Sequence, residues 1–211
     1  MNRDWVILKN LISDSTIITL LCDNQESKTQ FISNILTLRQ VQNKVSIYLD
    51  IDTNFTVFLE DHKDLSYSEH LYLFRPNGNT IDDIVAEICS ISPTWLDTII
   101  FDSISSFYST QGETETSSNM NRRLGRYISL LQTVVSRNKG HIIFTSMTRA
   151  RKKRDETWYI SYAGGRLLTE RSDLILELKN NKFGFEVSIL KSPDSSLIGS
   201  KLNLNEKYIK N

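Results

Sequence analysis

The sequence predicts an α/β fold in which a mainly parallel central sheet is flanked by helices and extended by a C-terminal antiparallel hairpin. Short runs that are apolar on both faces, such as IITLL and LDTIIFD, alternate with amphipathic stretches of helical period. Strands of this kind need cover on both sides, which a parallel sheet between helices provides. Near the C-terminus, two strand-like runs instead surround the turn-forming segment NNKFG.

The predicted elements follow one another in a regular order. Strands of the parallel sheet are expected where short apolar runs occur, at residues 17–21, 45–51, 70–74, 96–102 and 141–147. Helices are expected where apolar residues recur at helical spacing, at residues 28–40, 81–91 and 122–138. The hairpin strands are expected at residues 173–179 and 185–190. Because there are only three prolines and no linker-like stretch, residues 1–211 are expected to form one domain.

The composition excludes several classes of protein. The 25 Lys and Arg residues balance the 25 Asp and Glu residues, so any contact with nucleic acid must come from a local patch. Two cysteines, Cys22 and Cys89, make neither a disulfide framework nor a metal site. We find no signal peptide and no membrane span, and expect no membrane partner. The expected location is intracellular: cytoplasmic or nucleoid-associated in a prokaryote, and nuclear in a eukaryote.

Polar residues follow several of the predicted strands, at the sheet edge where open α/β folds bind ligands. Lys28 and Thr29 come after the first strand, and Asp102 ends the fourth. This is the layout of a P-loop nucleotide fold, in which the lysine reaches the phosphates, the threonine ligates Mg²⁺ and the aspartate holds that ion through water. Taken alone, Lys28 and Thr29 would be an ordinary helix start.

The ordered set of motifs resembles the RecA/RadA recombinases and their paralogues. The resemblance runs from about residue 15 to the C-terminus and rests on five segments: YLDIDTNF (48–55), IIFDSISSFYS (99–109), GHIIFTSMTRA (140–150), YAGGRLLTERSDLILEL (162–178) and LKSPDSS (190–196). It implies a RecA-like P-loop NTPase fold in which the family's catalytic glutamate falls on Asp52. The length implies a short, RadB-like paralogue without the N-terminal helical domain.

Three departures from the family pattern concern the nucleotide site. The segment CDNQESKT lacks the glycines that let backbone amides close on phosphates. Its Asp23 and Glu26 would face a tetra-anion, and two unit charges 4 Å apart interact by about 4 kcal/mol at an effective dielectric of about 20. Asp52 is shorter than glutamate, and Ser146 and Met147 replace the family's Asn and Gln. We therefore expect a degenerate Walker A motif, no cofactor, and little or no ATP hydrolysis.

A second interpretation is that the protein still hydrolyses ATP. In it the protein is a weak but genuine RecA- or KaiC-like, DNA-dependent ATPase. Lys28, Thr29 and Asp102 would bind Mg-ATP, with the Mg²⁺ held by Thr29 and Asp102, and Asp52 would be catalytic.

The segment RARKKRDETWY is the strongest candidate for contact with DNA. In the family, the mobile loop at this place contacts single-stranded DNA. Cations neutralise phosphates and aromatic rings stack on bases; here these residues are Arg149, Arg151, Lys152, Lys153, Arg154, Trp158 and Tyr159. The alternatives are a solvated basic loop and a patch that docks an acidic partner.

Residues 109–126 match the family's other DNA-facing loop by position. This segment is acidic and rich in hydroxyls at first, then basic at Arg122, Arg123 and Arg126. A flexible connector is the preferred interpretation, and a weak DNA contact is the alternative.

Together these features predict an accessory factor in homologous recombination or DNA repair. The expected partners are DNA, with single strands preferred, and a recombinase or recombinase paralogue. A structural subunit of a paralogue complex, without DNA contact, is the further alternative.

Overall fold

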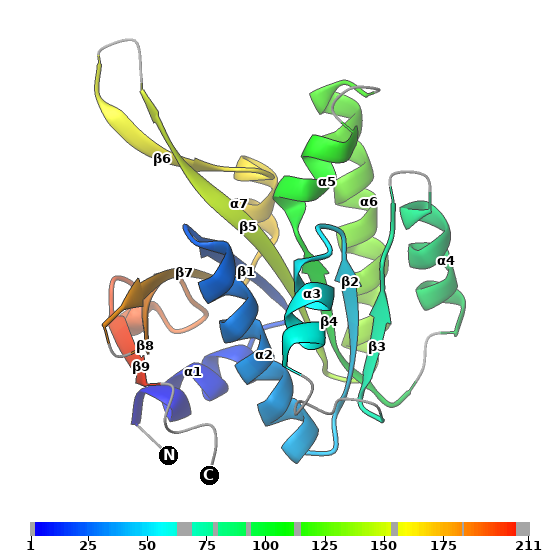
Figure 1. The fold of residues 1–211 in the computed structure, drawn as a ribbon, viewed down its shortest axis with the longest axis horizontal. Coiled ribbons are helices and arrows are strands. Elements are labelled where there is room, and N and C mark those ends of the chain that lie inside the picture. Colours follow the sequence, from blue (N-terminus) through cyan, green and yellow to red (C-terminus); the bar gives the residue numbers. More distant parts are fainter. Residues whose placement is uncertain are drawn as a thin grey trace.

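The computed structural model describes residues 3–62, 69–77, 80–91, 94–111, 115–152, 156–182 and 184–205. Its central feature is one sheet with the strand order β3-β2-β4-β5-β1-β7-β8-β9, and β6 pairs with β5 outside this path (Figure 1). Strands β1 to β5 and β7 are parallel to their neighbours in this order, whereas β8 and β9 continue the sheet in antiparallel fashion.

The strands lie where short apolar runs occur in the sequence. Their bounds are β1 Ile17–Cys22, β2 Val45–Asp50, β3 Leu71–Phe74, β4 Leu96–Asp102, β5 His141–Lys152, β6 Trp158–Tyr162, β7 Leu174–Asn181, β8 Gly184–Lys191 and β9 Lys201–Asn205. The predicted α/β fold, with its parallel sheet and C-terminal hairpin, is confirmed.

Helices cover both faces of the sheet. They are α1 Arg3–Ser13, α2 Gln25–Val41, α3 Asn54–Asp61, α4 Ile81–Ile91, α5 Ile104–Gln111, α6 Ser117–Ser136 and α7 Gly165–Arg171, with a short 3₁₀ turn at Ser195–Leu197. Because strand side chains alternate between faces, Ile18 and Leu20 pack with Leu8 of α1 and Phe31 of α2, whereas Ile17 packs into the cluster that contains α4, α5 and α6. No helix in the described part of the chain has the length and apolar character needed to cross a bilayer.

The structure differs from the sequence prediction at several elements. Helices α1, α3, α5 and α7 and strand β9 were not predicted. Helix α2 begins at Gln25, three residues earlier than expected, because the side chain of Asn24 caps it by accepting from Ser27 N at 3.0 Å. Helix α6 begins at Ser117, because Thr116 caps it by accepting from Asn119 N at 3.3 Å.

The largest difference is at the predicted basic loop. Strand β5 continues past the sheet to Lys152 and pairs with β6, so that the two form an antiparallel ribbon that projects from the body of the protein (Figure 1). The aromatic and β-branched content of WYISY favours a strand at this place, whereas the neighbouring charges indicated a loop. We call Thr148–Lys152 and Trp158–Tyr162 the ribbon.

Candidate functional site

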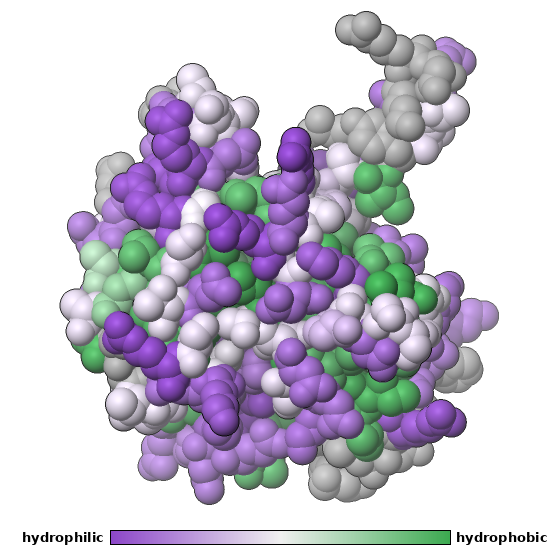
Figure 2. Space-filling model, turned by 180° about the vertical axis from the view of Figure 1, so that it is seen from behind, coloured by the Kyte–Doolittle hydropathy of each residue, from purple (hydrophilic) through white to green (hydrophobic). Residues whose placement is uncertain are grey.

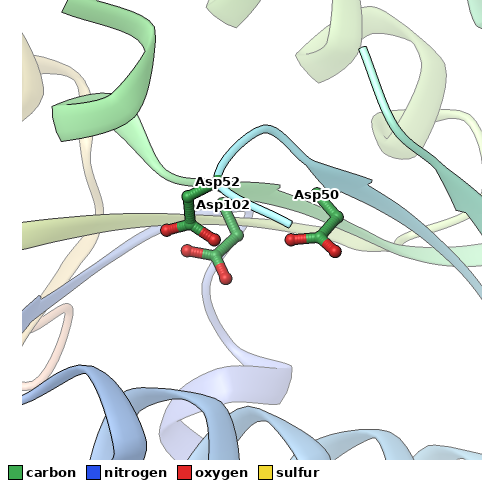
Figure 3. A group of neighbouring side chains, drawn as sticks. All are labelled: Asp50, Asp52 and Asp102. Carbon is green, nitrogen blue, oxygen red and sulfur yellow. The ribbon is translucent and has the colours of Figure 1, made fainter. Parts of the chain in front are cut away.

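The sheet brings together the residues that the sequence predicted for a nucleotide site. Lys28 Nζ lies 2.9 Å from Asp52 Oδ2 and 2.5 Å from Asp102 Oδ1. The side chains of Lys28 and Asp102 are fully buried, and that of Asp52 is 12% exposed. Figure 3 shows the carboxyl groups of Asp52 and Asp102 next to each other, with Asp50 to one side. The lysine thus bridges two carboxylates of its own chain.

Asp102 has further partners that hold it in place. Tyr48 donates its hydroxyl to Oδ2 at 2.5 Å, and Thr145 donates its hydroxyl to Oδ1 at 2.5 Å. With Lys28, three donors from three different elements converge on this carboxylate, which satisfies a buried charge. Tyr48 was not predicted as a site residue, although it lies in the YLDID segment, two residues before Asp50.

The charges of this cluster follow from burial and proximity. Burial opposes the ammonium form of Lys28, but Asp102 and Asp52 outweigh it and raise the pKa of Lys28. Burial raises the pKa of Asp102, in spite of Lys28. For Asp52, Lys28 outweighs burial, and the pKa of this carboxyl is lowered. Lys28 and Asp52 therefore form an ion pair, and Asp102 shares the same cation.

The turn before Lys28 leaves no cradle for phosphates. Only Asp23 and Asn24 separate β1 from α2, so most of the CDNQESKT segment is helical. The amide of Lys28 donates to Asn24 O at 3.1 Å, and the hydroxyl of Thr29 donates to Gln25 O at 3.0 Å. Groups that would bind a triphosphate and its Mg²⁺ are thus engaged within the helix. In this arrangement the Lys28 amide and the Thr29 hydroxyl both already have an acceptor within their own helix.

A third carboxylate, Asp50, lies close to Asp52 and Asp102. Ligand oxygens of the three lie within 4.8 Å of one another, a grouping that a divalent cation could use. However, Asp50 Oδ2 accepts from Thr56 N at 2.8 Å and from Thr56 Oγ1 at 2.6 Å. Asp50 therefore serves the first turn of α3, and Lys28 supplies the positive charge for the other two.

Two adjacent serines of α5 make separate contacts, one with the carboxylate cluster and the other with the residues that lead into the ribbon. Ser106 Oγ lies 3.5 Å from Asp52 Oδ2. Its neighbour on α5, Ser105, accepts from Met147 N at 2.9 Å and lies 3.3 Å from the hydroxyl of Ser146. Sequence reasoning missed these serines, because small hydroxyl residues after a strand carry no distinctive spacing.

The ribbon presents exposed aromatic and aliphatic residues beside its cations. Trp158 pairs with Lys152, and Ile160 pairs with Ala150, so these four residues lie on one face. Trp158 is 70% exposed and Ile160 is 55% exposed. Lys152 forms an exposed ion pair with Glu156 at 3.3 Å.

The other residues predicted for the basic segment are placed less completely. Arg149 is exposed at the base of the ribbon, opposite Ser161. Arg151 and Tyr159 are described only as a pair in the strand register. Lys153 and Arg154 lie outside the described residues.

The second predicted DNA-facing segment is largely helical. Arg122, Arg123 and Arg126 all lie within α6, and not in a loop. Arg123 donates to Asp82 at 2.9 Å and also to Glu115, and its guanidinium lies 5.7 Å from the ring centre of Phe107. Arg123 therefore ties α4, α5 and α6 together, which makes it a structural residue. Arg122 and Arg126 are exposed.

Comparison with known proteins adds to the fold assignment. No family model matches the sequence, and no curated protein matches it. Among solved structures, a crystal structure of the RadB recombinase matches with a TM-score of 0.66 and 18% sequence identity, over 87% of this chain and 84% of that chain. This likeness shows the RecA-like fold that the motifs indicated.

Proposed function

We propose that this chain is a recombinase paralogue that binds single-stranded DNA and a recombinase partner, as an accessory factor in homologous recombination or DNA repair, without hydrolysing ATP. The observation that carries the proposal is the position of Lys28. Its ammonium group is fully buried and paired with Asp52 and Asp102, so it is not available to phosphates. A RecA-like fold without a working nucleotide site can act by association alone.

The ribbon supports the DNA-binding part of the proposal. A protein with no net charge needs a local patch to attract a polyanion. Lys152 stands on an element that projects into solvent, directly opposite the exposed Trp158, and Arg149 lies at the base of the same element on its other face. Cations there would neutralise phosphates, and the indole would stack on a base regardless of sequence.

The recombinase partner is proposed from the fold alone. The structural neighbour is itself a recombinase, and the proposed partner follows from that likeness.

The rival function is a weak ATPase. It is favoured by one observation: Lys28, Thr29, Asp52 and Asp102 do converge at one edge of the sheet. Against it stand the helical turn and the engaged amide and hydroxyl described above.

Fluorescence anisotropy with labelled oligonucleotides tests the proposed function. We expect the protein to bind a single strand more tightly than a duplex. Its affinity should fall steeply between 50 and 200 mM salt, because each phosphate contact lowers the logarithm of the binding constant by about 0.7 for every tenfold rise in salt. Addition of Mg-ATP should leave this affinity unchanged. Absence of binding at low salt would leave the structural-subunit alternative, and binding that requires ATP would support the ATPase.

A further inference from the structure

A cavity of about 360 Å³ lies between α5 and the base of the ribbon. Its walls come from Ser105, Tyr108 and Ser109 on α5 and from Met147, Arg149 and Tyr162 on the other side. Figure 2, which views the molecule from behind, shows the ribbon standing away from the body at this end. The volume lies near the lower end of the range of small-molecule sites, about 300–1,000 Å³. It therefore suits a single small group.

The aromatic walls of this cavity are held in place by neighbouring elements. Tyr108 donates its hydroxyl to Asn121 on α6. The hydroxyls of Tyr162 and Thr169 lie 2.6 Å apart, which ties the second ring to α7. Because both rings are fixed before any ligand arrives, little side-chain freedom remains to be lost on binding.

The lining suits a flat heteroaromatic group next to an anion. Two tyrosine rings and the thioether of Met147 supply apolar surface, and the serine hydroxyls can bond to the polar edge of a ring. Arg149 is exposed, and no carboxylate in the described ranges forms an ion pair with it. A guanidinium in this state is well suited to a phosphate.

We infer that the cavity receives one unpaired nucleobase of a bound single strand, with Arg149 on the adjacent phosphate. This inference rests on the proposed function, since the strand would reach the cavity from the ribbon, at whose base Arg149 lies. A base within a duplex is stacked on its neighbours and paired with the opposite strand. It would have to lose both interactions in order to enter the cavity. The cavity would therefore add a preference for single strands that the cations of the ribbon cannot supply.

Two variants test this inference without touching the ribbon. Tyr108→Ala removes one aromatic wall, and Ser109→Leu fills part of the cavity from an exposed helix position. Ser129→Leu is the matched control, because Ser129 on α6 is also exposed and donates to the carbonyl of Gly125 at 3.0 Å, as Ser109 does to that of Ser106 at 3.0 Å. For each variant, anisotropy gives the affinity for an ordinary single strand and for a strand of the same length made entirely of abasic nucleotides.

We expect both cavity variants to bind the ordinary strand about 10-fold more weakly, the loss typical of one stacked base. Their affinity for the abasic strand should equal that of the unmodified protein, and Ser129→Leu should match it on both strands. If the unmodified protein retains neither strand at low salt, the proposed function fails. If the unmodified protein binds both strands and Ser109→Leu changes neither affinity, the cavity inference alone is overturned. Equal losses of affinity for both strands would also overturn the cavity inference, since such losses indicate a phosphate contact only.

Discussion

Replacing Lys28 with methionine should lower the free energy of unfolding by about 3–5 kcal/mol, as removal of one partner from a buried ion pair usually does. Methionine fills most of the same volume but leaves Asp52 and Asp102 without their shared cation, and Asp102 is fully buried. Urea denaturation measures the loss. The matched control is Lys44→Met, because Lys44 is half exposed and pairs with Asp97 at 3.4 Å; its loss should stay below about 1 kcal/mol.

The deficit of Lys28→Met should also depend on pH. Burial already raises the pKa of Asp102, and loss of Lys28 removes the charge that opposes this rise. A carboxyl whose pKa is higher in the folded than in the unfolded state costs stability as the pH rises above its unfolded value of about 3.9. The deficit should therefore be small near pH 4 and grow toward neutral pH. A double variant that adds Asp102→Asn should recover part of the stability, and a deficit that is equal at all pH values would contradict the ion-pair account.

The triple variant Lys152→Ala, Lys153→Ala, Arg154→Ala should bind single-stranded DNA about 100-fold more weakly at 50 mM salt. Each lost phosphate contact removes about 0.7 from the slope of log affinity against log salt for a single strand, so the slope should fall by about 2. Anisotropy across a salt series, with retention in a gel as a second readout, measures both quantities.

The control for the triple variant removes positive charge elsewhere. Lys44→Ala with Lys139→Ala takes away two exposed cations near the amino ends of the strands, at the edge opposite the carboxylate cluster. It should leave the salt slope within experimental error of the unmodified protein. Unchanged retention of DNA by the triple variant would refute the basic segment 149–159 as a DNA-binding element.

The sequence predicts the sheet well because its strands are buried on both faces. Runs such as LDTIIFD at β4 leave few other structures open, and the structure places that strand at Leu96–Asp102. The spacing of apolar residues does not predict the structure of a segment that is exposed on both faces. The two strands of the ribbon are separated by only a few residues. Their charged residues are as compatible with a loop as with a strand at the edge of a sheet.

The candidate site is predictable only in part. The approach of Lys28, Asp52 and Asp102 follows from topology, since the carboxyl ends of parallel strands meet at one edge. The direct pairing of Lys28 with both carboxylates does not follow, because a flexible lysine chooses among many rotamers according to burial and local charge. The early start of α2 depends on the Asn24 cap, a signal present in the sequence but outweighed by the resemblance to a phosphate loop.

A thermal-shift titration with Mg-ATP is the most direct test of the central claim that Lys28 serves the fold and not a nucleotide. A ligand present at about 100 times its dissociation constant would add about 2.7 kcal/mol of stability and raise the melting temperature measurably. We predict no rise at millimolar Mg-ATP. A concentration-dependent rise that Lys28→Met abolishes would contradict this account and establish a working nucleotide site.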